Sequence, residues 1–366
     1  MGSLNMKNVL ITGGAGFIGS NFVHHLLKAE PGVRLINLDA LTYAGSQENL
    51  KDLPAGTAYS FIEGNICNSD LVAGLLRQHA IDTIVHFAAE SHVDRSISDP
   101  EPFVQTNIVG TFRLLEAARQ FWLEEKGILD RPVRFHHVST DEVYGSLSLE
   151  EPAFSETTPY APNSPYAASK ASSDHLVRSY AHTFNLPVTI TNCSNNYGPR
   201  QFPEKLIPLI ILNALDGKKL PVYGDGQQIR DWLFVDDHCE AILAVIKHGS
   251  AGETYNIGGE NQPTNLTIVE TICDLLDEFK PDPTISSRRS LIHFVTDRPG
   301  HDQRYAMNID KIRKNLGWQP RHSLQDGLRE TVLWYLSKPD WVAAISAQLV
   351  PKQRLSNNSI ILFKEM

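Results

Sequence analysis

Apolar residues along the first half of the chain fall into short runs, and these runs alternate with segments of helical spacing. Runs of the buried-strand type lie at 8–12, 34–38, 60–66, 81–87, 134–139 and 188–192. Helical spacing is present at 20–29 and, over a longer stretch, at 166–184. Strands that alternate with helices favour right-handed βαβ units and a parallel sheet. The pattern therefore predicts the α/β class, with a Rossmann-type doubly wound parallel sheet.

A glycine-rich turn follows the first predicted strand directly. Its residues, Gly13-Gly14-Ala15-Gly16-Phe17-Ile18-Gly19, match the dinucleotide fingerprint in two overlapping registers. Glycines in such a turn let backbone amides approach a pyrophosphate at a helix N-terminus. Asp39 ends the second predicted strand, where its carboxylate can accept hydrogen bonds from a ribose diol and would repel a 2′-phosphate. This context predicts a dinucleotide site rather than a purely structural turn, and it favours NAD over NADP.

Two further motifs carry candidate chemistry. Lys170 lies one helical turn after Tyr166, where its ammonium can lower the pKa of the phenol and make Tyr166 a usable base. Upstream, Thr140 follows a predicted strand and precedes Asp141 and Glu142. Plain hydride transfer does not need two more carboxylates, whereas an elimination needs a proton donor and a proton acceptor. The sequence therefore indicates an oxidation that serves a second reaction; the alternative is a pair of solvated acids at a strand end.

Composition narrows the range of partners and compartments. The net charge of −9 and the isoelectric point near 5.9 argue against a general nucleic-acid or acidic-membrane partner. No apolar run reaches membrane-spanning length, and the four cysteines lie far apart without a CxxC pair. We therefore expect a cytoplasmic protein with reduced thiols and no metal site. The adjacent pair His136-His137 cannot face one metal ion from a strand, so we expect both to be scaffold residues.

Taken together, the motifs resemble the extended short-chain dehydrogenases that act on nucleotide sugars, and within that family the dTDP-glucose 4,6-dehydratases. The resemblance covers about residues 6–340 and rests on segments 13–19, 87–95, 140–145, 166–170, 192–199, 203–208, 223–226, 230–232 and 298–302. Related epimerases generally carry small residues where this chain has Asp141 and Glu142. That pair is the specific clue.

The resemblance implies a role for each catalytic residue. Tyr166, with Lys170 and Thr140, would deprotonate the 4-hydroxyl of the sugar while hydride passes from C4 to NAD⁺. The resulting ketone acidifies the C5 hydrogen, which Glu142 would remove, and Asp141 would protonate the departing 6-hydroxyl. Hydride would then return to C6, which gives a 4-keto-6-deoxy sugar and regenerates NAD⁺.

The resemblance also implies two sets of binding residues. Those near the cofactor are Gly13, Gly16, Phe17, Ile18, Gly19, Asp39, Thr42, Asn65, Ile66, Phe87, Ala88, Ala89, Ser91, Thr106, Tyr166, Lys170 and Asn196. Those near the nucleotide sugar are Ser91, Thr140, Asn195, Lys205, Leu206, Pro221, Val222, Tyr223, Arg230, Asn265, Arg298 and His301. Many relatives have Asp at the position of Asn65, near the adenine amino group. Because Asn can still accept a hydrogen bond there, we expect slightly altered NAD affinity.

Residues 6–192 are expected to form mainly the NAD-binding Rossmann domain, and 193–340 mainly a smaller nucleotide-sugar-binding lobe, with the chain free to cross between them. That second part has a helical segment at 205–216 and many prolines. Residues 341–366 are expected to be a tail of unknown role, and the residues before Met6 are expected to lie outside the fold. By analogy with relatives, we expect a homodimer that pairs through helices at about 101–121 and 166–184.

Two alternatives remain open at this point. The first is a nucleotide-sugar 4-epimerase or decarboxylase on the same scaffold, which the Asp141-Glu142 pair disfavours. The second is a catalytically silent NAD-binding regulatory protein, which would not require Thr140, Tyr166 and Lys170 together. The sequence does not show whether the base of the nucleotide sugar is thymine or uracil. It also does not show whether the product is used to make rhamnose or another deoxysugar.

Overall fold

The computed structural model describes residues 3–54, 56–125, 132–297 and 301–354, with the backbone alone for 349–354. The strands are β1 (Asn8–Thr12), β2 (Arg34–Asp39), β3 (Tyr59–Glu63), β4 (Thr83–His86), β5 (Arg134–Thr140), β6 (Val188–Cys193), β7 (Asn195–Tyr197), β8 (Leu220–Tyr223), β9 (Trp232–Phe234), β10 (Thr254–Ile257) and β11 (Ile292–Val295). The longer helices are α1 (Phe17–Ala29), α2 (Ser69–Gln78), α5 (Thr111–Arg119), α6 (Pro165–Phe184), α7 (Leu206–Leu215), α8 (Val235–His248), α9 (Asn265–Phe279), α11 (Leu324–Ser337) and α12 (Pro339–Arg354). Shorter helical segments are η1 (Gln47–Leu50), α3 (Val93–Ser98), α4 (Glu101–Phe103), η2 (Val104–Gly110), η3 (Gln120–Glu124), η4 (Asp141–Tyr144), η5 (Arg288–Leu291) and α10 (Asp310–Leu316).

Seven strands form one parallel sheet in the order β10-β6-β5-β4-β1-β2-β3. The prediction of a Rossmann-type doubly wound sheet is confirmed. The direction of winding reverses between β1 and β4, where Thr12 lies opposite His86 in the register. In open α/β sheets a ligand binds outside the carboxyl ends of the strands at this reversal. The fold therefore places the candidate site at the carboxyl ends of β1, β4 and β5.

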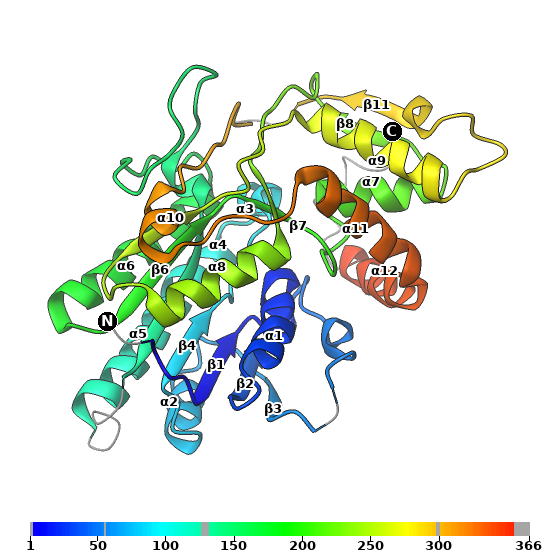
Figure 1. Cartoon of the computed structure of the whole chain (residues 1–366). Helices are drawn as coiled ribbons and strands as arrows, with labels where there is room; N and C mark the ends of the chain where they lie inside the picture. The colour runs from blue at the N-terminus through cyan, green and yellow to red at the C-terminus, as the bar shows by residue number, and fades with distance from the viewer. Residues whose placement is uncertain (1–2, 55, 126–131, 298–300, 355–366) are drawn as a thin grey trace.

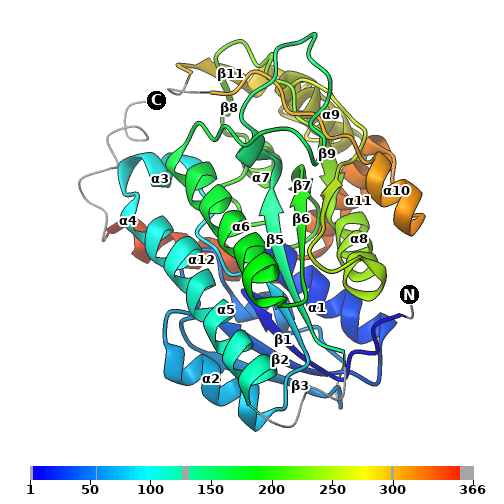
Figure 2. The same ribbon diagram turned by 90° about the vertical axis from the view of Figure 1, so that its left-hand side faces the viewer.

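Helices cover both faces of the sheet, and the side chains of β1 show how. Leu10 packs with α2, α5 and α6 on one face, whereas Val9 and Ile11 pack with α1 and α8 on the other. Successive side chains of a strand point to opposite faces, so a continuous apolar run fills both cores. Figure 1 shows α1 and α8 on their face of the sheet, and Figure 2 shows α5 and α6 side by side on the opposite face.

Local sequence sets the ends of α6, the helix that carries two candidate catalytic residues. Ser164 caps its start by accepting a hydrogen bond from the backbone N–H of Ala167 at 3.1 Å, and Pro165 fills the first helical position. Asn185 ends the helix in the left-handed conformation with φ of 54°. Tyr166 is thereby fixed in the first turn, close to the carboxyl end of β5.

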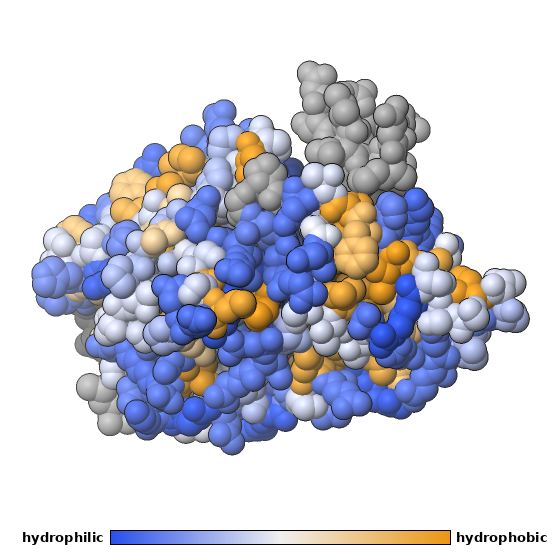
Figure 3. All heavy atoms as spheres, turned by 90° about the horizontal axis from the view of Figure 1, so that it is seen from above, coloured by the Kyte–Doolittle hydropathy of each residue, from blue (hydrophilic) through white to orange (hydrophobic). Residues whose placement is uncertain are grey.

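A second core lies under the smaller lobe, where the parallel pair β8 and β11 packs with α7, α9, α11 and α12. Figure 3 views the molecule from above the orientation of Figure 1 and shows hydrophobic side chains as separate patches among hydrophilic ones. None of the described helices combines the length and the apolar character needed to cross a bilayer.

α8 and β10 lie in the later half of the chain and return to the main sheet, where β10 pairs with β6, a crossing that the expectation allowed. The structure differs from the expected organisation in two places. The expected tail begins as α12, whose Trp341 and Ile345 are buried with α11 and whose Trp341 indole donates to Asn49 at 2.8 Å. The expectation that residues before Met6 lie outside the fold is wrong for Leu4. Its side chain is buried, and its N–H donates to the Lys247 carbonyl at 2.9 Å.

Candidate active site

In the glycine-rich turn between β1 and α1, Gly13 and Gly19 are closely packed against backbone, whereas Gly16 has open space beside it. A Cβ added at Gly13 or Gly19 would lie 2.6 or 2.2 Å from backbone atoms, and Gly13 has φ of +74°. A Cβ at Gly16 would meet nothing closer than the Gly13 carbonyl at 3.4 Å. Gly16 is also the N-cap of α1, which has no acidic residue in its first turn. The turn therefore leaves room beside a helix N-terminus, as a pyrophosphate requires.

Asp39 lies at the carboxyl end of β2 and faces this turn. Its Oδ2 accepts from the N–H of Ala15 at 2.8 Å, and its Oδ1 accepts from the N–H of Leu41 at 2.8 Å. Burial raises the pKa of the carboxyl, while these two hydrogen bonds act in the opposite direction. Each oxygen keeps a further lone pair, so the carboxylate is oriented as a ribose diol would require. The residues of the turn and Asp39 fit a dinucleotide.

The other predicted cofactor residues fall into two groups. Phe87, Ala88, Ala89 and Ser91 follow β4, next to the glycine turn, and the Ala88 N–H donates to Thr12 at 3.4 Å. The side chain of Ile66 is buried in the core beneath α2 and α5, so only its backbone can face a ligand. Thr42 follows β2, Asn65 follows β3, and Thr106 lies in η2. Asn196 lies in β7, and its Oδ1 lies 2.8 Å from His238 Nδ1.

Thr140, Asp141 and Glu142 lie at the end of β5 and the start of η4. The Thr140 hydroxyl donates to Asp141 Oδ1 at 3.2 Å and accepts from the Glu142 N–H at 3.3 Å. Asp141 is 1% exposed, and its Oδ2 has no hydrogen-bond partner among the described residues. Burial, followed by the nearby carboxylates Glu142 and Asp231, holds the pKa of Asp141 well above its ordinary value. A carboxyl group that keeps its proton near neutral pH is a competent general acid.

Tyr166 and Lys170 lie on the buried face of α6, beside the same strand end. The Lys170 ammonium donates to the Val138 carbonyl at 2.8 Å. Burial lowers the pKa of Lys170, and Asp174 and Cys193 act in the opposite direction. The expectation that the pKa of Tyr166 is lowered is wrong for this structure. Burial and the negative charge of Glu142 hold it well above its ordinary value, against a hydrogen bond with Thr140.

Arg230, from the smaller lobe, lies near the candidate catalytic residues. It is 5% exposed, and its guanidinium donates to the carbonyls of Ile229 at 2.7 Å and Asp302 at 3.0 Å. The same group lies 4.4 Å from the ring centre of Tyr305. Arg230 acts to lower the pKa of Asp141, which places its positive charge within electrostatic reach of that carboxyl. This is a fixed cation of the kind that grips phosphate oxygens.

The remaining predicted substrate residues are spread over the smaller lobe and the loops facing the sheet. Lys205 is the N-cap of α7 and donates to the Ser91 carbonyl at 3.2 Å, so one contact joins two predicted sites. Tyr223 and His301 have ring centres 6.3 Å apart. Val222 is buried in the second core, so its backbone alone can face a ligand. Leu206 begins α7, Pro221 lies in β8, Asn265 begins α9, and the Oδ1 of Asn195 in β7 is buried. Arg298 lies outside the described residues.

Comparisons with known proteins agree with this geometry. The family model described as GDP-mannose 4,6 dehydratase matches residues 10–331. The chain belongs to this family. A dTDP-glucose 4,6-dehydratase of Xanthomonas campestris pv. campestris (strain B100) is 55% identical over 340 residues, covering 93% of this chain and 96% of that protein. A dTDP-glucose 4,6-dehydratase 1 of Escherichia coli (strain K12) is 54% identical over 342 residues, covering 91% and 94%.

Among solved structures, a dTDP-glucose 4,6-dehydratase from Streptomyces venezuelae with NAD and TYD bound has a TM-score of 0.84 and 46% identity. It covers 92% of this chain and 99% of that one. Membership of the dehydratase family therefore rests on nearly the whole length of the chain, including both lobes.

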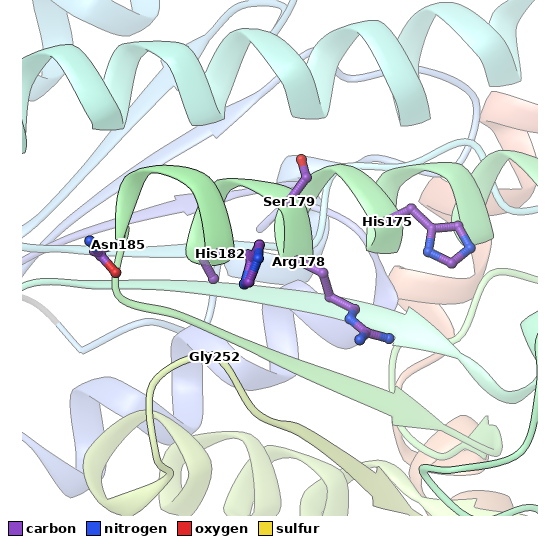
Figure 4. A pocket seen from close by; sticks show the side chains of 7 residues that line it. His175, Arg178, Ser179, His182, Asn185 and Gly252 are labelled. Carbon is purple, nitrogen blue, oxygen red and sulfur yellow. The ribbon is translucent and has the colours of Figure 1, made fainter.

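A surface hollow of about 670 Å³ lies on the outer side of α6, away from the catalytic residues. Figure 4 shows His175, Arg178 and His182 extending from α6, with Gly252 on the neighbouring loop. All three side chains are exposed, whereas Tyr166 and Lys170 on the same helix are buried. This hollow is separate from the candidate active site, because none of the candidate catalytic residues lines it.

Sequence reasoning missed several buried residues around the site. Tyr305 is 2% exposed, its hydroxyl donates to Asp302, and the charge of Glu142 contributes to raising its pKa. Asp174 lies one turn beyond Lys170 on the same face of α6 and is fully buried. The spacing of Tyr166, Lys170 and Asp174 at intervals of four was the available signal for Asp174. No comparable spacing pointed to Tyr305, because long-range packing brings it to the site.

Proposed function

We propose that this protein is an NAD-dependent nucleotide-sugar 4,6-dehydratase that converts dTDP-glucose into dTDP-4-keto-6-deoxyglucose. The observation that carries the proposal is the buried Asp141 beside Glu142, Thr140 and Tyr166, where burial holds the pKa of its carboxyl well above the ordinary value. The relatives named dTDP-glucose 4,6-dehydratase, one of them solved with NAD and TYD bound, support the substrate and the cofactor. Gly13, Gly16 and Gly19, together with Asp39, would hold the cofactor.

The first stage is oxidation of the sugar at C4. Tyr166 takes the proton of the 4-hydroxyl, and Thr140 orients that hydroxyl at the carboxyl end of β5. Lys170 supplies a positive charge behind Tyr166 that offsets the cost of forming a buried phenolate. The glycine turn and Asp39 would hold NAD, which would supply a hydride acceptor for C4 and a hydride donor for C6, so the overall reaction is redox-neutral.

The second stage is loss of water across C5 and C6. The C4 ketone acidifies the C5 hydrogen, and Glu142 removes it as a proton. Asp141 donates its proton to the 6-hydroxyl, which leaves as water while a C5–C6 double bond forms. Reduction at C6 and return of a proton to C5 complete the 4-keto-6-deoxy sugar. Glu142 and Asp141 thus act as general base and general acid in one elimination.

Arg230, Lys205 and the residues of β8 would hold the nucleotide diphosphate. The partly fixed guanidinium of Arg230 suits bidentate contact with phosphate oxygens. With the anionic part of the substrate held there, in the smaller lobe, the sugar would reach the ends of β5 and α6.

Mass spectrometry of the product from dTDP-glucose tests the proposal. We expect a product lighter by one water, with no free NADH released during steady turnover. A product of unchanged mass would instead indicate the epimerase alternative, and one NADH per turnover would indicate an ordinary dehydrogenase. UDP-glucose serves as the comparison substrate for the choice of base.

We further propose a cytoplasmic homodimer that pairs through the helices 101–121 and α6. The support for the compartment is that Cys67, Cys193, Cys239 and Cys273 are all free thiols. The support for pairing is apolar surface on the outer face of these two helices, where Val104 is 44% exposed and Phe184 is 40% exposed.

A further inference from the structure

The buried face of α6 carries a third ionisable residue that the proposed mechanism does not use. Tyr166, Lys170 and Asp174 follow one another at intervals of four residues, so they lie in a row along one side of the helix. All three are buried, and Asp174 is 0% exposed. Buried carboxylates are rare unless they are paired or hydrogen-bonded, so the surroundings of Asp174 should explain its presence.

The Asp174 carboxylate is held by donors from three segments that build the active site. Its Oδ2 accepts from the Ser139 hydroxyl at 2.9 Å, from the Tyr160 hydroxyl at 2.9 Å and from the Asn192 amide at 3.4 Å. Ser139 is the residue before Thr140, and Asn192 also donates to the Thr140 carbonyl at 3.3 Å. The carboxylate therefore ties α6 to β5 and β6 at the level of the catalytic residues.

The other carboxylate oxygen faces a neutral histidine. Oδ1 lies 3.2 Å from His137 Nε2, but the contact does not have the geometry of a hydrogen bond. Burial and the Lys170 charge hold the pKa of His137 well below its ordinary value. His86 and His136 lie beyond it and are likewise buried, with pKa values lowered by burial first. This cluster of imidazoles supplies no positive charge near neutral pH.

The other ionisable groups around Asp174 are neutral, so the positive charge that its carboxylate balances is that of Lys170. Tyr144 from η4 and Tyr160 from the following loop both have raised pKa values, chiefly through burial, so both stay neutral. Cys193 from β6 is also neutral, because burial raises the pKa of its thiol. Lys170 acts to lower the pKa of Asp174, which burial nevertheless raises to about 6. Above that value Asp174 is ionised and its charge favours the protonated form of Lys170.

We propose that Asp174 is a positioning residue for the reaction, whose carboxylate keeps the Lys170 ammonium charged and in place behind Tyr166. The inference rests on the role assigned to Lys170 in the proposed function. Lys170 is buried and donates to a neutral carbonyl, so without a nearby anion it would lose its proton at a lower pH. The loss of that charge would slow the oxidation stage while leaving the nucleotide-binding residues of the smaller lobe untouched.

The test compares the holoenzyme with Asp174→Asn, a change that keeps the shape and removes the charge. Single-turnover reduction of bound NAD⁺ by dTDP-glucose is followed across pH. We expect the rate to fall about tenfold or more, with the KM for dTDP-glucose changed less than about twofold. The decrease of this rate on the high-pH side of the pH–rate profile, its alkaline limb, should move to lower pH by about one unit or more. The reason is that Lys170 then loses its proton at a lower pH. Asp174→Glu should restore the position of that limb.

Asp237→Asn is the matched control. Asp237 is a buried carboxylate on α8 that accepts from the His322 N–H at 3.0 Å, and it does not act on the pKa of Lys170. It should leave the alkaline limb in place. A folded Asp174→Asn protein with wild-type rate and wild-type alkaline limb would overturn the proposal and leave Asp174 as a packing residue.

Two further arms keep the test decisive. If Asp174→Asn does not fold, Tyr160→Phe removes one donor to the carboxylate and should raise the pKa of Asp174, which moves the acid limb to higher pH. An unmoved acid limb would then count against the proposal. If the wild-type enzyme does not act on dTDP-glucose, the proposed function fails. The pH limbs are then measured on NAD⁺ reduction by UDP-glucose, which tests Asp174 separately.

Discussion

At the residue scale, the pKa values of the buried carboxylates depend on which hydrogen-bond donors and charges lie beside them. Asp39 accepts two backbone N–H groups, which oppose the effect of burial on its pKa. Asp231 accepts three, from Gly259, Asn261 and Met307, and its pKa is raised to about 6. Asp141 has one hydroxyl donor and two nearby carboxylates, so its pKa is raised well above the ordinary value. Of these three carboxylates, the proposed proton donor Asp141 is the one with the fewest hydrogen-bond donors.

The first prediction separates oxidation from elimination. Asp141→Asn and Glu142→Gln keep the approximate shapes but remove the proton donor and the base. Both variants should still reduce bound NAD⁺ in a single turnover, seen as NADH absorbance, yet form product roughly 10²–10⁴-fold more slowly. Tyr166→Phe is the contrasting variant and should lose the NADH signal itself. Loss of that signal in the Asp141 and Glu142 variants would move the pair into sugar oxidation or binding.

The second prediction concerns stability. The folded-state pKa of Asp141 lies above its ordinary, unfolded value, so above that ordinary value the folded state binds more protons and the free energy of unfolding falls as pH rises. Asp141→Asn removes this dependence. We expect its Tm to exceed that of the wild type by about 2–4 °C near neutral pH, with the difference shrinking toward pH 4. Calorimetry across pH checks this, and a lower Tm for the variant at neutral pH would mean that Asp141 is ionised.

The third prediction concerns Asn65, where many relatives have Asp. The side-chain oxygen of Asn65 accepts from the Cys67 N–H at 2.8 Å, so it is already engaged within its own turn. Asp would offer a second oxygen to an adenine amino group. We expect Asn65→Asp to tighten NAD binding by about fivefold, the equivalent of one hydrogen bond near 1 kcal/mol, as measured by titration calorimetry. Unchanged or weaker binding would place the adenine elsewhere.

At the scale of elements, two glycines of the turn between β1 and α1 are expected to have different roles. Gly19 is needed for folding, and Gly16 leaves room for the cofactor. A Cβ at Gly19 would lie 2.2 Å from the Gly13 carbonyl, whereas a Cβ at Gly16 would meet only ordinary contact at 3.4 Å. Gly19→Ala should therefore cost roughly 1–3 kcal/mol of stability. Gly16→Ala should keep a near wild-type Tm but weaken NAD binding about tenfold or more, because its methyl group fills the cradle. Normal NAD affinity in Gly16→Ala would show that the pyrophosphate does not approach this residue.

The elements that sequence alone could predict are those whose local pattern matches their surroundings. β1, β2, β5 and α6 were found to within a residue or two, because continuous apolar runs and clear end signals mark them. β7 and β10 were missed, since each is four residues or fewer and is held by pairing with a distant strand. α12 was missed because its buried residues pack against segments far away in the sequence. Long-range contacts fix these elements, and no local spacing records such contacts.

At the scale of the whole molecule, the two helical segments proposed for dimerisation run side by side with their starts together. Phe103 contacts Tyr166 at the start of α6, and Arg119 lies 5.0 Å from the Phe184 ring at its end. Figure 2 shows α5 and α6 facing the viewer on one side of the sheet. Val104 and Phe184 therefore mark the two ends of one outer face, with the half-buried Ile108 and Phe112 between them.

The last prediction tests that face. Val104→Glu adds a charge at a position that is already exposed in one subunit, so folding of the subunit should be unaffected. In a homodimer paired through this face the charge would be buried without a partner, at a cost on the order of 2–5 kcal/mol. We expect analytical ultracentrifugation to show a dimer for the wild type, and for Val104→Glu a dimer dissociation constant raised at least about thirtyfold, which shifts the protein toward monomer. Leu149→Glu is the control, because Leu149 is 58% exposed and lies after η4, away from these helices. A wild-type monomer would exclude the homodimer, and a Val104→Glu protein that remains as tightly dimeric as the wild type would place the interface on another surface.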